Sequence, residues 1–181
     1  MRKFGFLRLS FVSFIFLCYC SSLTAQIQRK FWGLELSRST KYEVKSFLSS
    51  NDLKYDNLAG FNAISTDMFS KLAFDNYMWS VTFQFYHDTL YEVQMLITKQ
   101  GFSKEIGRYD NRTDFIFHDL REKLANKYNN FDNPYNINSQ TLFARIDNQT
   151  VIDLEFDDNG NVILTYSDLK LAAKAEAGND L

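Results

Sequence analysis

Apolar and polar residues alternate along four segments of the chain, which fall into two neighbouring pairs. Side chains of a strand point alternately to the two faces of a sheet, so each segment predicts a strand with one buried face. Turn-forming stretches at 87–89 and 158–161 separate the members of each pair and predict two antiparallel hairpins. The apolar positions are Trp79, Val81, Phe83, Phe85, Tyr91, Val93, Met95, Ile97, Ile152, Leu154, Phe156, Val162, Leu164 and Tyr166.

Apolar residues at helical spacing predict two helices. The first covers about 40–50, because Thr40 and Glu43 have the spacing of a capping box and Asn51 predicts its end; Ser39 is the alternative cap. The second begins near Thr113, with Asp114 as an alternative cap. The two apolar stripes are Val44, Phe47 and Leu48, and Phe117, Leu120, Leu124 and Tyr128.

Three weaker patterns complete the chain. Residues 68–74 and 142–146 predict further strands, and the asparagine-rich stretch 129–138, which contains Pro134, predicts a loop. The tail, 171–181, is rich in alanine and lysine and predicts a short, frayed helix.

The order of these elements predicts an α+β fold with an internal repeat. The hairpins superpose at an offset of 71 residues and the helices at about 73. The prediction is therefore a tandem helix-plus-antiparallel-meander repeat over about 31–100 and 110–168, with the helices packed on the antiparallel sheet. A sandwich of the same elements without a repeat is the alternative.

The first 25 residues have the order of a secretory signal peptide. A basic start is followed by an apolar run from Leu9 to Tyr19, and small or polar residues lead to Ala25. We place the cleavage after Ala25, leaving one α+β domain at 26–170 and the tail 171–181. Both cysteines, Cys18 and Cys20, fall inside this segment, and neither follows a small residue, which disfavours a lipid anchor.

Charge and composition narrow the classes of partner. The predicted signal peptide holds three of the 20 basic residues and none of the 22 acidic ones, so the remainder carries five more acidic than basic residues. This balance disfavours nucleic acid as a partner, and no later apolar run is long enough to predict a transmembrane segment. No motif for a metal, a phosphate or a cofactor occurs, so none is expected.

The opening Trp32-Gly33-Leu34-Glu35-Leu36, followed by Thr40 and a helix with Val44 and Leu48, resembles the β-lactamase-inhibitor-protein-like small exported proteins. That resemblance implies a tandem repeat of helices packed on an antiparallel sheet. SmpA/OmlA lipoproteins use a related single unit. The segments 164–168 and 179–181 are similar to uncharacterised exported proteins of Gram-negative bacteria. The chain departs from the fold's namesake in having no cysteine after residue 25, and from SmpA/OmlA in its lipid-acceptor pattern, so the resemblance implies no site residues.

Few residues suggest catalysis. His87 in a turn and His118 on a helix have no local partner that catalysis requires, and we expect both to be solvated. The run from Asp157 to Asn161 resembles the start of a calcium loop, yet a tight turn fits it better. The strand carboxylates Asp153 and Glu155 suggest a hydrolase, but alternation places them on a face that we expect to be solvated.

The leading hypothesis is an exported, periplasmic or secreted, non-catalytic module of the bacterial envelope that binds a protein, a peptide or a glycan. We expect the binding to use a sheet face that helices leave uncovered. A carboxylate-dependent hydrolase is the alternative, and an envelope-assembly factor held by protein contacts is a third possibility. The aromatic residues proposed for ligand binding are Trp32, Tyr86, Tyr91 and Tyr109.

Overall fold

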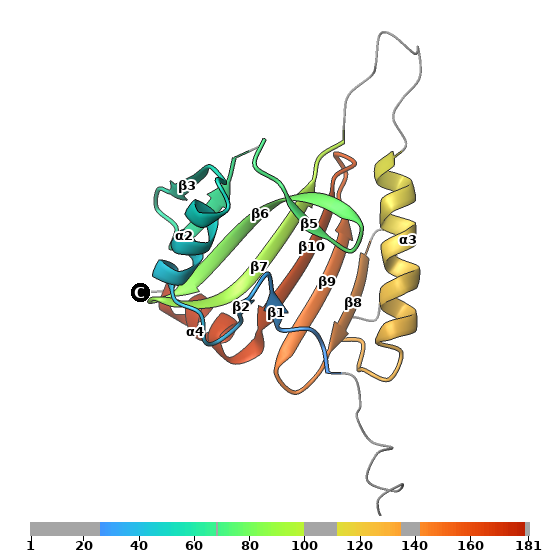
Figure 1. The fold of residues 1–181 in the computed structure, drawn as a ribbon. Coiled ribbons are helices and arrows are strands. Elements are labelled where there is room, and N and C mark those ends of the chain that lie inside the picture. The colour runs from blue at the N-terminus through green and yellow to red at the C-terminus, as the bar shows by residue number, and fades with distance from the viewer. Residues whose placement is uncertain (1–25, 68, 100–111, 135–141, 180–181) are drawn as a thin grey trace, which may run out of the picture.

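The computed structural model describes residues 26–67, 69–99, 112–134 and 142–179, and it shows an α+β fold built on one large antiparallel sheet (Figure 1). Within these residues the sheet is eight-stranded, in the order β3-β4-β6-β7-β10-β9-β8, and β5 pairs with β6 outside this order. The predicted signal peptide and Tyr109 lie outside the described residues. The strands of the sheet are β3 (Tyr55–Leu58), β4 (Ala63–Thr66), β5 (Leu72–Phe74), β6 (Tyr77–Tyr86), β7 (Thr89–Ile97), β8 (Leu142–Ile146), β9 (Thr150–Phe156) and β10 (Val162–Asp168).

Both predicted hairpins are confirmed. β6 pairs with β7 and β9 pairs with β10, each antiparallel, and β7 also pairs with β10, which joins the two halves into one sheet. The α+β class and the antiparallel sheet are therefore confirmed. The tandem repeat is not shown and stays a prediction.

The predicted strand at 68–74 is too long, because pairing with β6 begins only at Leu72. Strands β3 and β4 were not predicted. β3 is short and largely exposed, so its sequence has no apolar alternation to detect. The two-residue strands β1 (Lys30–Phe31) and β2 (Leu34–Glu35), which form a separate hairpin, were not predicted either. Each is too short to show an alternation, although Phe31 and Leu34 are buried.

The helices match the predicted ones closely. Helix α2 (Lys41–Ser50) begins after Thr40, whose side chain and that of Glu43 form the predicted capping box, and Asn51 is its C-cap. Helix α3 (Arg112–Lys127) buries its predicted stripe. Helix α4 (Leu169–Asn179) covers most of the predicted tail helix. Because α4 follows β10 directly, it begins two residues earlier than predicted.

One core lies between the sheet and the elements that cover its first face. Trp79, Val81 and Phe83 of β6 meet Phe117 and Leu120 of α3 in a single buried cluster, which also contains apolar side chains of α2 and of the β1–β2 hairpin. Figure 1 shows α2 and α3 near opposite edges of the sheet, with β1 and β2 between them.

The apolar faces of the two predicted hairpins are thus confirmed as core, except at Tyr91. A register shift between Gln84 and Phe85 pairs Phe85 with Leu90, so Leu90 is buried in the core and Tyr91 is not part of it.

The turn between β1 and β2 shows how the hairpin reaches this core. Trp32 and Gly33 both have positive φ, 51° and 92°, as a two-residue hairpin turn requires. A positive φ is unfavourable for tryptophan, but the ring of Trp32 packs against those of Phe47, Phe74 and Phe83. Its indole nitrogen donates to the carbonyl of Ala73 at 2.8 Å.

Candidate functional site

The second face of the sheet, opposite the core, is polar along its centre. The register places Gln84, Glu92 and Ser167 in one row across β6, β7 and β10. The next row runs from Thr82 through Gln94 and Thr165 to Asp153 on β9. We call these seven residues, together with Tyr86 and Tyr91, the polar face. All except Ser167, which is buried, are half-buried.

Glu92 is held in place by its neighbours. Its carboxylate accepts hydrogen bonds from the Gln84 side-chain amide and from the Ser167 hydroxyl, the latter at 2.8 Å. Helix α4 contacts β6, β7 and β10 near Glu92, and its Glu176 acts on Glu92 and Tyr91, so a helix partly covers this face rather than leaving it uncovered as expected. Burial, together with the charge of Glu176 on α4, raises the pKa of Glu92 despite these two hydrogen bonds.

Asp153 is a second carboxylate with a raised pKa. Burial is the main cause, and the charges of Glu92 and Glu155 add to it, which brings the pKa of Asp153 to about 6. Its Oδ1 atom is shielded from solvent and has no hydrogen-bond partner among the residues that the structure describes. The prediction of a fully solvated acidic face is therefore wrong for Asp153, although Glu155 is exposed as expected.

Neither carboxylate is neutralised within the described part of the chain. The ion pairs found there involve other acidic residues, namely Glu35, Asp75, Asp119 and Asp168. A buried charge without a counter-ion is costly, so proteins rarely retain one without a functional reason. The polar face therefore carries negative charge that a bound cationic group can neutralise.

The predicted ligand-binding aromatics fall in different places. Tyr86 and Tyr91 lie on the polar face, where the Tyr91 hydroxyl donates to the Gln84 side-chain oxygen at 3.0 Å. The ring centres of Tyr86 and His87 are 4.3 Å apart. Burial and the neighbouring Glu92 raise the pKa of Tyr91. Trp32 packs on the core side instead, and Tyr109 is outside the described residues.

Sequence reasoning missed Glu92 and Gln84. Both lie at polar positions of predicted strands, where a solvated side chain is the ordinary expectation. The available signal was that Glu92 and Asp153 fall on the same face once β7 pairs with β10, but nothing in the hairpin pattern predicts that pairing.

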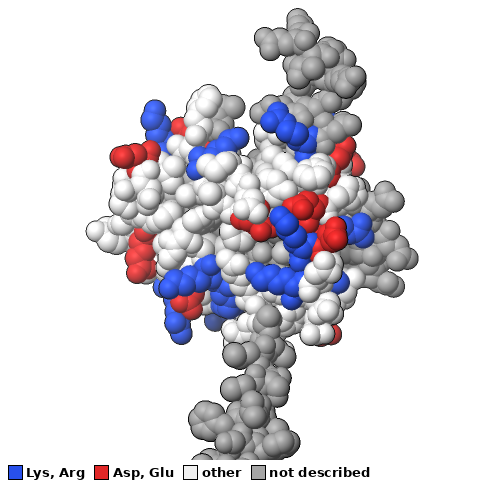
Figure 2. All heavy atoms as spheres, turned by 45° about the vertical axis from the view of Figure 1, so that its right-hand side comes forward, with Lys and Arg blue, Asp and Glu red and all other residues white. Residues whose placement is uncertain are grey.

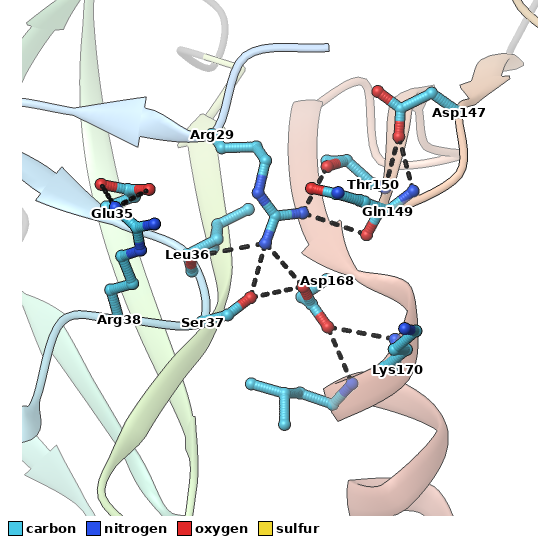
Figure 3. Close-up of polar contacts among 11 residues, drawn as sticks. Arg29, Glu35, Leu36, Ser37, Arg38, Asp147, Gln149, Thr150, Asp168 and Lys170 are labelled. Carbon is cyan, nitrogen blue, oxygen red and sulfur yellow. Dashed lines mark hydrogen bonds and ion pairs between the residues drawn. The ribbon is translucent and has the colours of Figure 1, made fainter. Parts of the chain in front are cut away.

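A second polar cluster is built around Arg29 (Figure 3). Its guanidinium forms an ion pair with Asp168 at 2.6 Å and donates to the Thr150 hydroxyl at 2.7 Å and to the Ser37 hydroxyl. Asp168 also accepts from the backbone of Lys170 and Leu171, so it caps α4.

Beside this cluster lies a cavity of about 300 Å³. The charged groups around it include the cations of Arg29, Arg38 and Lys170 and the carboxylates of Glu35 and Asp168. Since Arg29 and Asp168 already satisfy each other, the cluster fastens the N-terminal segment to α4, and we assign it a structural role.

The remaining candidates have structural explanations. Asp157 accepts hydrogen bonds from the backbone and side-chain amides of Asn161, so its oxygens close the predicted turn. His87 and His118 are exposed. Among the described residues no group of three histidine, cysteine, aspartate or glutamate side chains is arranged to hold a metal ion.

Comparisons with known proteins add no relatives. The chain matches no protein-family model, no curated protein and no solved structure. None of the helices described in the structure has the length and apolar character needed to span a membrane.

Proposed function

We propose that this chain is an exported, non-catalytic binding module of the bacterial envelope, and that its ligand lies on the polar face. The observation that carries the proposal is the pair of half-buried carboxylates, Glu92 and Asp153, which have raised pKa values and no ion pair among the described residues. The tyrosines and amides around them add hydrogen-bonding groups. Stability given up at a surface site is commonly a requirement of binding.

The chemistry of the face favours a basic peptide segment among the partners considered, which were a protein, a peptide or a glycan. The positive charge of lysine and arginine side chains can neutralise the negative charge of the carboxylates of Glu92, Asp153 and the exposed Glu155. A neutral glycan would leave that charge unmatched. Basic and acidic groups share the side of the molecule brought forward in Figure 2. Acidic residues outnumber basic ones from Gln26 onward, and nucleic acid is not part of the proposal.

The export of the chain and its origin belong to the same proposal. They rest on the signal-like order of residues 1–25 and on the resemblance to β-lactamase-inhibitor-protein-like proteins. The finer architecture, a tandem repeat, is likewise proposed. Its support is that two antiparallel meanders, β4–β6–β7 and β8–β9–β10, meet through their last strands.

A labelled tetralysine peptide tests the ligand class directly. The chain from Gln26 onward is titrated against it at low ionic strength, with fluorescence anisotropy as the readout. The account predicts saturable binding that Asp153→Asn weakens about tenfold, because one of the carboxylates that contact the peptide is lost.

The matched control for this experiment is Glu122→Gln, which removes the same charge from α3 on the opposite side of the sheet. It should bind the peptide as the wild type does. Equal losses in the two variants would show that net charge alone attracts the peptide. Retention of a neutral oligosaccharide in place of tetralysine would overturn the ligand class.

A hydrolase that uses Asp153 is the second candidate. The specific observation in its favour is that burial raises the pKa of Asp153 to about 6, as a general acid requires. Its partner is then Glu92 or Glu155. Turnover of glycoside or ester substrates that Asp153→Asn abolishes would favour this candidate, whereas binding without turnover favours the first.

A further inference from the structure

A separate cavity of about 280 Å³ lies on the core side of the sheet, away from the polar face. It is bounded by α3, by the β5–β6 hairpin and by β10. Apolar side chains form its wall, since Leu120 and Leu124 come from α3, Leu164 and Tyr166 from β10, and Phe74 from β5. Phe74 is the most exposed of the five, since it is partly buried and the other four are buried.

The rim of this cavity is charged. Lys123 is already engaged, because its ammonium lies 2.7 Å from Asp119 and 3.9 Å from Asp75. Lys127 also lines the cavity, and among the described residues it forms no ion pair. Its ammonium lies 5.0 Å from the centre of the Tyr128 ring, which leaves the charge open to a second partner.

We propose that this cavity binds a small amphipathic anion, with an apolar body against the wall and a single carboxylate at Lys127. The volume is near the lower end of the range for small-molecule sites, about 300–1,000 Å³, and suits a short acyl chain. An uncharged apolar ligand would leave Lys127 unmatched. A strongly polar anion would leave the apolar wall uncovered, and Asp75 at the rim disfavours a second negative charge.

The two tryptophans of the chain provide a reporter for this site. The Trp32 indole donates to the carbonyl of Ala73 at 2.8 Å, and the Trp79 indole donates to the carbonyl of Phe74 at 2.9 Å. Both therefore hold β5, the strand that forms one wall of the cavity. A ligand that displaces Phe74 changes the surroundings of both indoles.

Octanoate is the probe for the test, titrated into the chain from Gln26 onward by calorimetry and by tryptophan fluorescence. The account predicts saturable binding in both measurements, and weaker binding of octylamine and of acetate. Lys127→Gln should weaken octanoate binding about tenfold, and Lys127→Arg should retain it. Lys174→Gln, which removes an exposed lysine from α4, should leave it unchanged.

Three results would overturn the proposal: no saturation, equal affinity for octylamine, or equal losses in Lys127→Gln and Lys174→Gln. The test is independent of the polar face, because Asp153→Asn should bind octanoate as the wild type does. Failure of the peptide experiment therefore leaves this inference standing, and the reverse also holds.

Discussion

At the scale of single residues, Asp153 is the clearest case of a side chain that costs stability. Its pKa is higher in the folded chain, about 6, than the usual 3.8, so the folded state binds the proton more tightly. Protonated Asp153 therefore contributes stability that is complete below about pH 4 and is lost as the pH rises through about 6, where the ionised side chain costs stability.

Asp153→Asn should therefore stabilise the protein at about pH 8 and not at about pH 4. We expect a gain of about 1–2 kcal/mol at the higher pH, which allows for the partial solvent exposure of the side chain. Urea unfolding at the two pH values measures it. A variant less stable than the wild type at both would show that the carboxylate is stabilising where it lies.

Arg29 and Asp168 have the opposite pH behaviour. Burial alone would raise the pKa of Asp168, but hydrogen bonds from Ser37 and Arg29 outweigh it and the pKa lies below its usual value. The stability from this pair is present above about pH 4 and is lost as the pH falls further.

Arg29→Ala should destabilise the fold by about 2–4 kcal/mol at neutral pH, because it leaves Asp168, whose side chain is only 9% exposed, without its counter-ion. Arg38→Ala is the control, since Arg38 is 78% exposed in its pair with Glu35 and should cost less than about 0.5 kcal/mol. Thermal unfolding followed by circular dichroism compares them. Similar losses in the two variants would refute the structural role given to Arg29.

At the scale of elements, α2 depends on its first turn. The Thr40 hydroxyl accepts from the backbone of Glu43, and the Glu43 carboxylate accepts from the backbone of Thr40 at 2.7 Å. Thr40→Ala should cost about 1 kcal/mol in denaturant unfolding, because one backbone donor loses its partner. Ser46→Ala, at an exposed position within the same helix, should be close to neutral, and an equal cost there would contradict the capping argument.

The elements with strong periodicity could be predicted from the sequence, and the others could not. The stripe from Phe117 to Tyr128 and the alternation of β6 depend on spacing alone, and both are buried as expected. β3 is an exposed edge strand, and its formation depends on pairing with β4 rather than on an apolar pattern. The polar face was predicted only in part, because its centre depends on the contact between β7 and β10.

At the scale of the whole molecule, the two halves share one core and one sheet. Leu154 on β9 belongs to the same buried cluster as Trp79 on β6. Both tryptophans lie in the N-terminal half, so their fluorescence reports unfolding there.

Leu154→Ala should therefore lower the midpoint of the tryptophan transition and of the circular dichroism transition by the same amount, with a cost of about 2–5 kcal/mol. Chemical denaturation followed with both signals measures this. An unchanged tryptophan transition would mean that the halves unfold separately, and the single core would then be wrong.

The central claim is that the polar face holds carboxylates whose charge a cationic ligand neutralises. The most direct measurement is the pKa of Asp153 by carbon-detected NMR, with and without tetralysine. The account predicts a pKa of about 6 in the free protein and a lower value with the peptide bound, because the ligand's charge favours the ionised form. A pKa near 4 in the free protein, or one that the peptide leaves unchanged, would contradict it.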